Sequence, residues 1–176
     1  KYVHSKFLAE DMRRLGEPAW KVIVDLSVSD DERVRDLAGS VMGQWFPLSE
    51  EKIPEIVAAL RREPGGWPAR ALMRIPSEEA TKALIDDVAR IGGGNQSSFA
   101  LGARLPEAFP LVFERMEEVD SIKLASGLSE VLSRPAEPEN LARRQDIVKW
   151  LMAAASNQGK APAYRRQATG FLLDMG

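Results

Sequence analysis

The sequence contains no cysteine and only one histidine, His4, among its 176 residues. Without cysteine the chain has no disulfides, no thiolate metal ligands and no cysteine nucleophile. A zinc site needs more histidines or some cysteines. A Ser-His-Asp triad would have to use His4, which lies within the first few residues. We therefore expect a protein that is not an enzyme and that holds no cofactor.

Neither sign of charge dominates, and long apolar runs are lacking. The net charge is −2, which gives no strong field for attracting nucleic acid or an anionic membrane. No apolar run approaches the ~18 residues that a membrane span requires. The chain shows no signal peptide, and we expect a cytoplasmic protein. Because it begins with Lys1 rather than Met, we expect it to be part of a longer polypeptide.

Proline, in contrast, recurs at a nearly constant interval. Five of the 11 prolines are separated by 29, 29, 30 and 29 residues: Pro18, Pro47, Pro76, Pro106 and Pro135. Proline ends a helix because it lacks an amide hydrogen, and it suits the first turn of the next helix. The interval therefore predicts a repeating unit of helix, proline turn and helix.

Apolar side chains spaced three and four residues apart predict helices along the whole chain. Val34, Leu37, Val41 and Met42 follow this spacing, for example. We expect helices near residues 2–15, 18–28, 31–46, 49–63, 67–75, 77–91, 96–105, 107–118, 120–133, 138–156 and 161–174. The fold class is therefore all-α, with one domain over residues 1–176. The helix at 161–174 lacks a second helix to complete its unit, so the chain has about five and a half two-helix units.

The segments that end at these prolines also resemble those of a known repeat family. The segments from Ala38 to Pro47, Ala71 to Pro76, Ala100 to Pro106 and Ala125 to Pro135 resemble the short HEAT-like repeats of bacterial and phycobilisome-associated proteins. The resemblance implies an α-α superhelix, or solenoid, in which the second helix of each unit lines a concave side. Because the helices at 67–75 and 96–105 are short, a related armadillo-like superhelix remains an alternative.

Three local patterns invite a chemical interpretation, and we favour a structural role for each. The run Gly92-Gly93-Gly94-Asn95 lacks the Lys-Ser/Thr of a phosphate loop and predicts a turn that ends a helix. Asp86 and Asp87 are adjacent on a helix, so they point about 100° apart and do not converge. Glu114, Glu117 and Glu118 lie one turn apart, where a solvated face is favoured over a divalent-ion site.

The second helices also supply the candidate binding residues. Their exposed polar positions carry both signs of charge, which suits a protein or peptide partner better than a polyanion. Trp67, at a helix start, is either an anchor for a partner or an element of packing between units. The candidate partner-binding residues are Trp67, Arg62, Asp86, Arg90, Glu114, Glu118, Arg144 and Lys149. The function predicted is that of a protein-interaction scaffold.

A nucleic-acid-binding or DNA-repair module on the same solenoid is the alternative. Four arginine pairs support it, at residues 13–14, 61–62, 143–144 and 165–166. HEAT-like DNA glycosylases grip DNA with basic residues of the concave face. Adjacent residues of a helix cannot both face one groove, however, and acidic residues are interleaved with these pairs, so we favour the protein partner.

Overall fold

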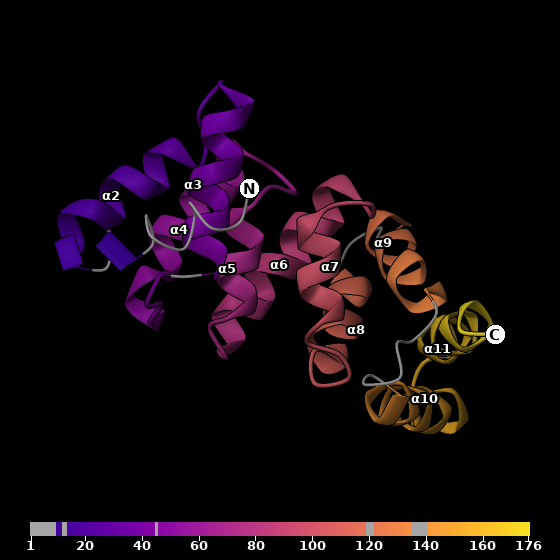
Figure 1. Ribbon diagram of the computed structural model, residues 1–176. Coiled ribbons are helices and arrows are strands. Elements are labelled where there is room, and N and C mark those ends of the chain that lie inside the picture. Colours follow the sequence, from indigo (N-terminus) through magenta and orange to yellow (C-terminus); the bar gives the residue numbers. More distant parts are fainter. Residues whose placement is uncertain (1–9, 12–13, 45, 119–121, 135–140) are drawn as a thin grey trace.

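The computed structural model describes residues 10–11, 14–44, 46–118, 122–134 and 141–176, and the side chains of residues 117 and 118 lie outside this description. Within these residues the protein has ten α-helices, one 3-10 helix and no strand. The chain passes from α2 at one end of the molecule to α10 and α11 at the other (Figure 1). The helices are α2 (Glu17–Leu26), α3 (Glu32–Gln44), η1 (Glu50–Lys52), α4 (Ile53–Arg62), α5 (Pro68–Met73), α6 (Glu78–Ile91), α7 (Gln96–Gly102), α8 (Phe109–Glu118), α9 (Ile122–Ser133), α10 (Leu141–Ser156) and α11 (Pro162–Asp174).

The all-α class is confirmed, and the helices from residue 17 onward lie close to the predicted ranges. Pro47, Pro76 and Pro106 lie between α3 and η1, between α5 and α6, and between α7 and α8. Pro18 lies in the first turn of α2, whereas Pro135 is outside the described residues. The short helices α5 and α7 end earlier than predicted, because the last residues before each proline form a turn rather than a helical continuation.

Side-chain caps start some of these helices. Ser77 Oγ accepts a hydrogen bond from the Ala80 amide at 3.2 Å, as expected for an N-cap serine. Asp31 Oδ1 accepts one from the Arg33 amide at 2.9 Å before α3. Ser49 follows Pro47 as Ser77 follows Pro76, which predicts the same kind of cap, but this prediction is wrong because the Ser49 side chain makes no cap hydrogen bond. The chain enters α4 through the 3-10 turn η1, whose Lys52 amide bonds to the Ser49 carbonyl instead.

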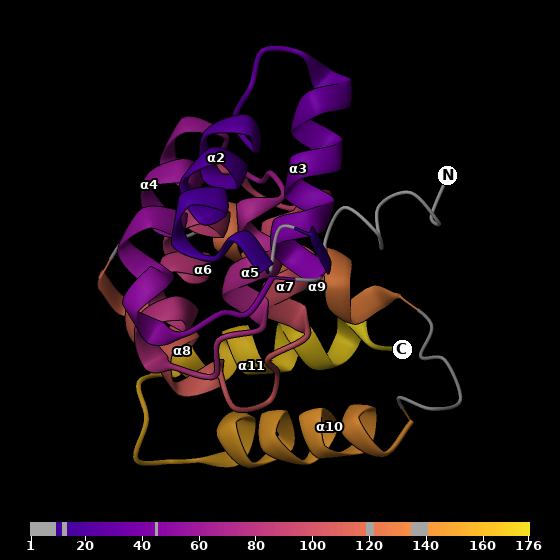
Figure 2. The ribbon, with the colours of Figure 1, turned by 60° about the vertical axis from the view of Figure 1, so that its left-hand side comes forward.

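The helices pack in two series. Contacts connect α3 to α5, α5 to α7, α7 to α9 and α9 to α11, while a second series connects α2 to α4, α4 to α6 and α6 to α8. Further contacts between the two series include α2 with α3, α4 with α5 and α6 with α7. The last helix is not isolated: α11 packs on α9 and lies side by side with α10 (Figure 2).

One hydrophobic cluster extends between the two series of helices, from Trp20 in α2 to Met175 after α11. Aromatic rings are its largest members, with Trp20, Phe109, Phe113 and Phe171 fully buried. Trp45 continues the apolar spacing of Val34, Val41 and Met42, which predicts a core position, but it lies outside the described part of the chain. Burial of a large aromatic side chain contributes roughly 2–3 kcal/mol, so the helices depend on one another for stability.

Cations from later segments cover the C-terminal ends of earlier helices. Arg90 donates to the carbonyl of Leu60 at the end of α4, at 3.3 Å. Arg104 donates to Leu72 O at the end of α5, at 2.6 Å. Arg143 bonds to carbonyls in the turn after α7, and Arg144 to Leu132 O in α9. The last carbonyls of a helix have no partner within it and carry its negative dipole end, so these cations stabilise the ends.

Small residues permit close approach where α6 and α9 meet. A Cβ atom on Gly127 of α9 would lie 2.7 Å from Val88 Cγ1 and 3.2 Å from the backbone of Gly92 and Gly93. Gly92 ends α6 with a φ of 91°, so the predicted glycine turn is confirmed. Asn95 then caps α7 and also donates to the Gly92 and Gly93 carbonyls at 2.8 Å.

Within the described part of the chain, none of the helices is both long enough and apolar enough to cross a membrane.

The two helical glycines of α9 and α11 provide a matched test of this close contact. We expect Gly127→Ala to lower the free energy of unfolding by about 1–3 kcal/mol, because the new methyl group overlaps packed atoms. Gly170→Ala meets no atom within 4 Å and is expected to raise it by up to about 1 kcal/mol through helix propensity. Urea unfolding followed by circular dichroism measures both changes. Equal effects of the two substitutions would contradict the close packing of α6 against α9.

Candidate functional site

Three hollows open along the series of helices α4, α6 and α8. The first lies between α4 and α6, has a volume of about 370 Å³ and is lined by Val57, Leu60, Arg61, Ala83, Asp86, Asp87 and Arg90. The second, of about 340 Å³, lies between α6 and α8 and is lined by Lys82, Ile85, Asp86, Leu111, Glu114 and Arg115. The third, also of about 340 Å³, is lined by Pro110, Glu114, Trp150, Lys160 and Tyr164. Asp86 and Glu114 each line two neighbouring hollows, so the three form one continuous surface, which we call the trough.

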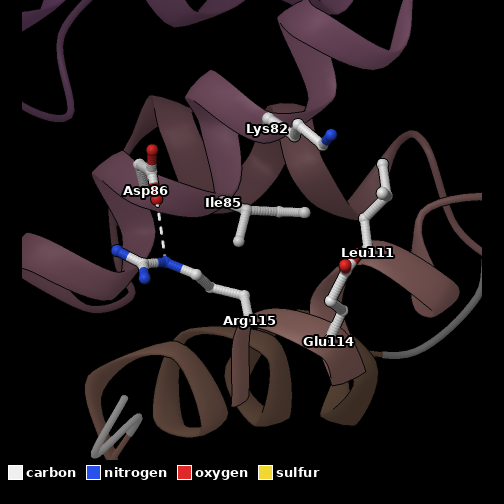
Figure 3. A pocket seen from close by; sticks show the side chains of 6 residues that line it. All are labelled: Lys82, Ile85, Asp86, Leu111, Glu114 and Arg115. Carbon is white, nitrogen blue, oxygen red and sulfur yellow. Dashed lines mark ion pairs between the residues drawn. The ribbon is translucent and has the colours of Figure 1, made fainter. Parts of the chain in front are cut away.

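The middle hollow combines an apolar centre with a charged border. Ile85 of α6 and Leu111 of α8 lie between the charged side chains (Figure 3). On one border, Arg115 Nε lies 2.9 Å from Asp86 Oδ1, which joins the two helices across the hollow. Lys82 lies one turn before Asp86 on α6 and pairs with Glu78 at 2.6 Å. An apolar floor with polar groups around it is the usual composition of a binding surface.

Asp86 and Asp87 have opposite environments, as their adjacency on one helix predicts. The side chain of Asp86 is 63% exposed, whereas that of Asp87 is 2% exposed. Asp87 Oδ2 accepts hydrogen bonds from the Gly65 amide at 2.8 Å and from Ser97 Oγ at 2.6 Å. Its other oxygen pairs with Arg90. Asp87 therefore joins the loop before α5 to the start of α7, while Asp86 faces the trough.

The structure brings three of the predicted binding residues together on the trough: Asp86, Arg90 and Glu114. Arg90 is partly engaged, because it also bonds to Asp87 and to the end of α4. Arg62 lies at the exposed end of α4, with its guanidinium 4.0 Å from Asp25. Glu118 ends α8, and its side chain lies outside the described part of the chain.

Trp67 lies on the other series of helices, away from the trough. Its indole Nε1 donates to Asp36 Oδ1 at 2.9 Å, and its side chain covers Gly39 so closely that a Cβ there would lie 2.2 Å from Trp67 Cβ. The Arg70 guanidinium lies 5.4 Å from the ring centroid. The half-buried Trp67 thus packs α5 against α3, which agrees with the packing alternative for this residue.

Arg144 and Lys149 of α10 also lie apart from the trough. Arg144 donates to Leu132 O at 3.2 Å, to Arg134 O at 3.1 Å and to Met175 O, so its guanidinium holds α9, α10 and the end of α11 together. Lys149 is 75% exposed and lies 3.3 Å from Asp146 on the same helix.

A fourth hollow, of about 600 Å³, lies beside the turns that precede α6 and α8, and it adjoins the trough because it shares Leu111 with the middle hollow and Pro110 with the third. Arg104 and Arg143 line it, together with apolar residues such as Met73 and Leu111. Burial lowers the pKa of Arg104 from its ordinary value, because the charged guanidinium loses contact with water. Both arginines already donate to backbone carbonyls, so their charges serve the fold.

Sequence reasoning missed the third hollow as a site. Neither Trp150 nor Tyr164 was among the predicted binding residues, and Pro110 lies 40 residues before the first of them in the sequence. Only the packing of α8 against α10 and α11 brings these residues together. A partial signal was that Trp150 lies four residues after Asp146 and seven after Arg143, which places a large aromatic ring on a charged face of its helix.

Comparisons with protein-family models, with curated proteins and with solved structures find no match to this chain. Among the residues that the structure describes, no group of three or more acidic or histidine side chains is arranged to hold a metal ion. The HEAT-like resemblance therefore stays a prediction, and the trough is the feature from which function can be argued.

The adjacent aspartates provide a sensitive test of these assignments. We expect Asp87→Ala to lower the free energy of unfolding by about 2–4 kcal/mol, because it leaves a buried amide and a buried hydroxyl without their acceptor. Asp86→Ala is expected to change it by less than about 1 kcal/mol, since an exposed ion pair contributes little. Chemical denaturation of the two variants measures the difference. Similar losses for both would contradict the assignment of Asp87 to the fold and Asp86 to the surface.

Proposed function

We propose that this chain is a HEAT-like solenoid that acts as a non-catalytic protein-interaction scaffold and binds an extended segment of a partner along the trough. The observation that supports this proposal is the presence of the three connected hollows. They follow one another across α4, α6, α8 and the α10–α11 pair, a path suited to a chain rather than to a compact small molecule. The proline turns at Pro47, Pro76 and Pro106 support the repeating unit on which the solenoid assignment rests.

The chemistry of the trough supports a protein partner. Apolar residues such as Ile85 and Leu111 alternate with charges of both signs, including Asp86, Glu114 and Lys82. Such a border can complement the mixed side chains of a peptide and can reject partners of the wrong charge pattern. Asp86, Asp87 and Glu114 lie between the cations of the trough, so it lacks the uninterrupted row of cations that a phosphate backbone requires.

One of the four arginine pairs gives little support to the nucleic-acid alternative. Arg143 and Arg144, one of the four pairs, donate to backbone carbonyls of α7, α9 and the chain end. A phosphate-binding surface needs cations whose donors are free for phosphate oxygens. We therefore favour the protein partner over nucleic acid.

Selection of displayed peptides on the immobilised chain tests the proposed function. We expect an enriched group of related peptides whose affinity falls about tenfold or more in Lys82→Glu, because this change reverses a charge at the middle hollow. Arg33→Glu reverses a charge on α3, away from the trough, and is expected to alter the affinity by less than about twofold. Fluorescence anisotropy with a synthesised peptide measures both. Failure to enrich any peptide, or equal losses in the two variants, would overturn the proposal.

A titration of labelled single-stranded and duplex DNA and RNA at low salt tests the alternative. Backbone charge contacts are strongest there, so a nucleic-acid module should bind well below the ~1 µM limit of ordinary non-specific binding and lose affinity steeply with salt. We expect no binding in this range. Tight, salt-sensitive binding that Lys82→Glu weakens would favour the alternative over the peptide scaffold.

A further inference from the structure

The third hollow differs from the rest of the trough because two aromatic side chains and a proline line it. Pro110 comes from the first turn of α8, Trp150 from α10 and Tyr164 from α11. Trp150 and Tyr164 are both half-buried, so part of each ring faces the hollow. Glu114 and Lys160 complete its border. The hollow lies at the end of the trough and joins the middle hollow at Glu114.

Buried rings hold both aromatic side chains in place. The Trp150 ring stacks on Phe109, with centroids 4.5 Å apart and an interplanar angle of 21°. Tyr164 packs on Phe113 with a centroid distance of 4.3 Å. Phe109 and Phe113 are themselves fully buried. Because buried rings support them, Trp150 and Tyr164 present apolar surfaces that lose little conformational entropy when a ligand binds.

The indole Nε1–H of Trp150 is also available as a hydrogen-bond donor. Trp20 Nε1 donates to Glu55 at 2.6 Å, and Trp67 Nε1 donates to Asp36 at 2.9 Å. Within the described residues, Trp150 Nε1 has no acceptor, and it is not among the buried groups that lack one. An accessible indole N–H beside an apolar hollow can donate to a carbonyl of a bound chain.

Cations are in excess along the trough. Its described lining residues include five cationic side chains and three carboxylates: Arg61, Lys82, Arg90, Arg115 and Lys160 against Asp86, Asp87 and Glu114. In the third hollow the Lys160 ammonium lies 5.1 Å from the centroid of the Tyr164 ring, and no described carboxylate forms an ion pair with it. This charge disfavours a cationic ligand on the same ring and complements an acidic one.

We propose that the third hollow binds a proline-containing peptide in the polyproline II conformation, with an acidic residue beside the prolines that pairs with Lys160. The inference rests on the proposed function and specifies its ligand. A polyproline II chain has no internal hydrogen bonds, so its carbonyls are free to accept from Trp150 Nε1. Its conformation is already formed before binding, and aromatic-lined grooves recognise such chains.

The spacing of the rings is compatible with this ligand. Trp150 and Tyr164 lie 5.3 Å and 4.3 Å from the centroid of Phe113, so their separation cannot exceed these two distances combined. One turn of a polyproline II helix is ~9 Å long, which is enough to reach across both rings. Prolines one turn apart would then contact Trp150 and Tyr164, with the intervening carbonyl near the indole.

A titration with labelled peptides tests the inference. The probe is a peptide of repeated Glu-Pro-Pro, and two matched peptides change one property each: repeated Glu-Gly-Ser keeps the charge without the prolines, and repeated Lys-Pro-Pro keeps the prolines with the charge reversed. We expect only Glu-Pro-Pro to bind, by fluorescence anisotropy. In a nitrogen–proton correlation spectrum, the indole signal that Trp150→Phe removes should shift on binding.

Two variants identify the contacts. Trp150→Phe keeps an aromatic ring and removes the N–H, and is expected to weaken binding about three- to tenfold. Lys160→Glu reverses an exposed charge and is expected to weaken it about tenfold or more. Arg33→Glu, on α3, should leave the affinity unchanged. Thermal unfolding confirms that each variant is folded, and Lys160→Glu keeps the test valid if Trp150→Phe is unstable.

The outcomes distinguish this inference from the proposed function. No binding of Glu-Pro-Pro, equal binding of Glu-Gly-Ser, or affinity unchanged in both Trp150→Phe and Lys160→Glu would overturn the inference. If peptide selection on the same chain then yields ligands that depend on Lys82 but lack proline, the scaffold proposal stands without it. If selection yields no ligand either, both proposals fail.

Discussion

The contacts between helices depend on cations that donate to carbonyls at the C-terminal ends of earlier helices. Arg90, Arg104 and Arg143 each satisfy carbonyls that their own helices leave without partners, at the ends of α4, α5 and α7. Such carbonyls carry the negative end of the helix dipole, and they would be costly to bury alone. With these ends closed, short helices such as α5 and α7 can pack side by side, and the apolar cluster from Trp20 to Met175 becomes continuous.

Because these arginines donate to carbonyls at helix ends, binding of a partner depends on other charged side chains. Arg144 is committed to carbonyls at the ends of α9 and α11, whereas Lys160 lies on the trough. The same division separates Asp87, buried in hydrogen bonds between helices, from the exposed Asp86. Asp86, on the proposed binding surface, and Asp87, in the hydrogen bonds that hold the helices together, are thus adjacent residues of α6. The proposed scaffold function depends on the surface that includes Asp86, and the packing of α5 and α7 on α6 depends on the hydrogen bonds of Asp87.

Much of the fold was predictable because its signals are local. The proline interval and the three-four apolar spacing predicted the helices, since a helix end at Pro76 or a cap at Ser77 depends on residues within a few positions. The site was only partly predictable. Asp86, Arg90 and Glu114 were recognised from their positions on second helices, but Trp67 lies elsewhere because it fits over Gly39, and nothing local indicates that fit.

By itself, then, the sequence determined the all-α class, the positions of most helices and the opposed directions of Asp86 and Asp87, because helical geometry sets all three over short distances. Only the tertiary structure decided which cations close helix ends, and that Pro110, Trp150 and Tyr164 share one hollow. Those contacts join residues of different helices, such as Arg90 and Leu60, which are 30 positions apart, and Pro110 and Trp150, which are 40 positions apart. The hollow exists only because α10 and α11 pack on the same buried rings of α8, Phe109 and Phe113.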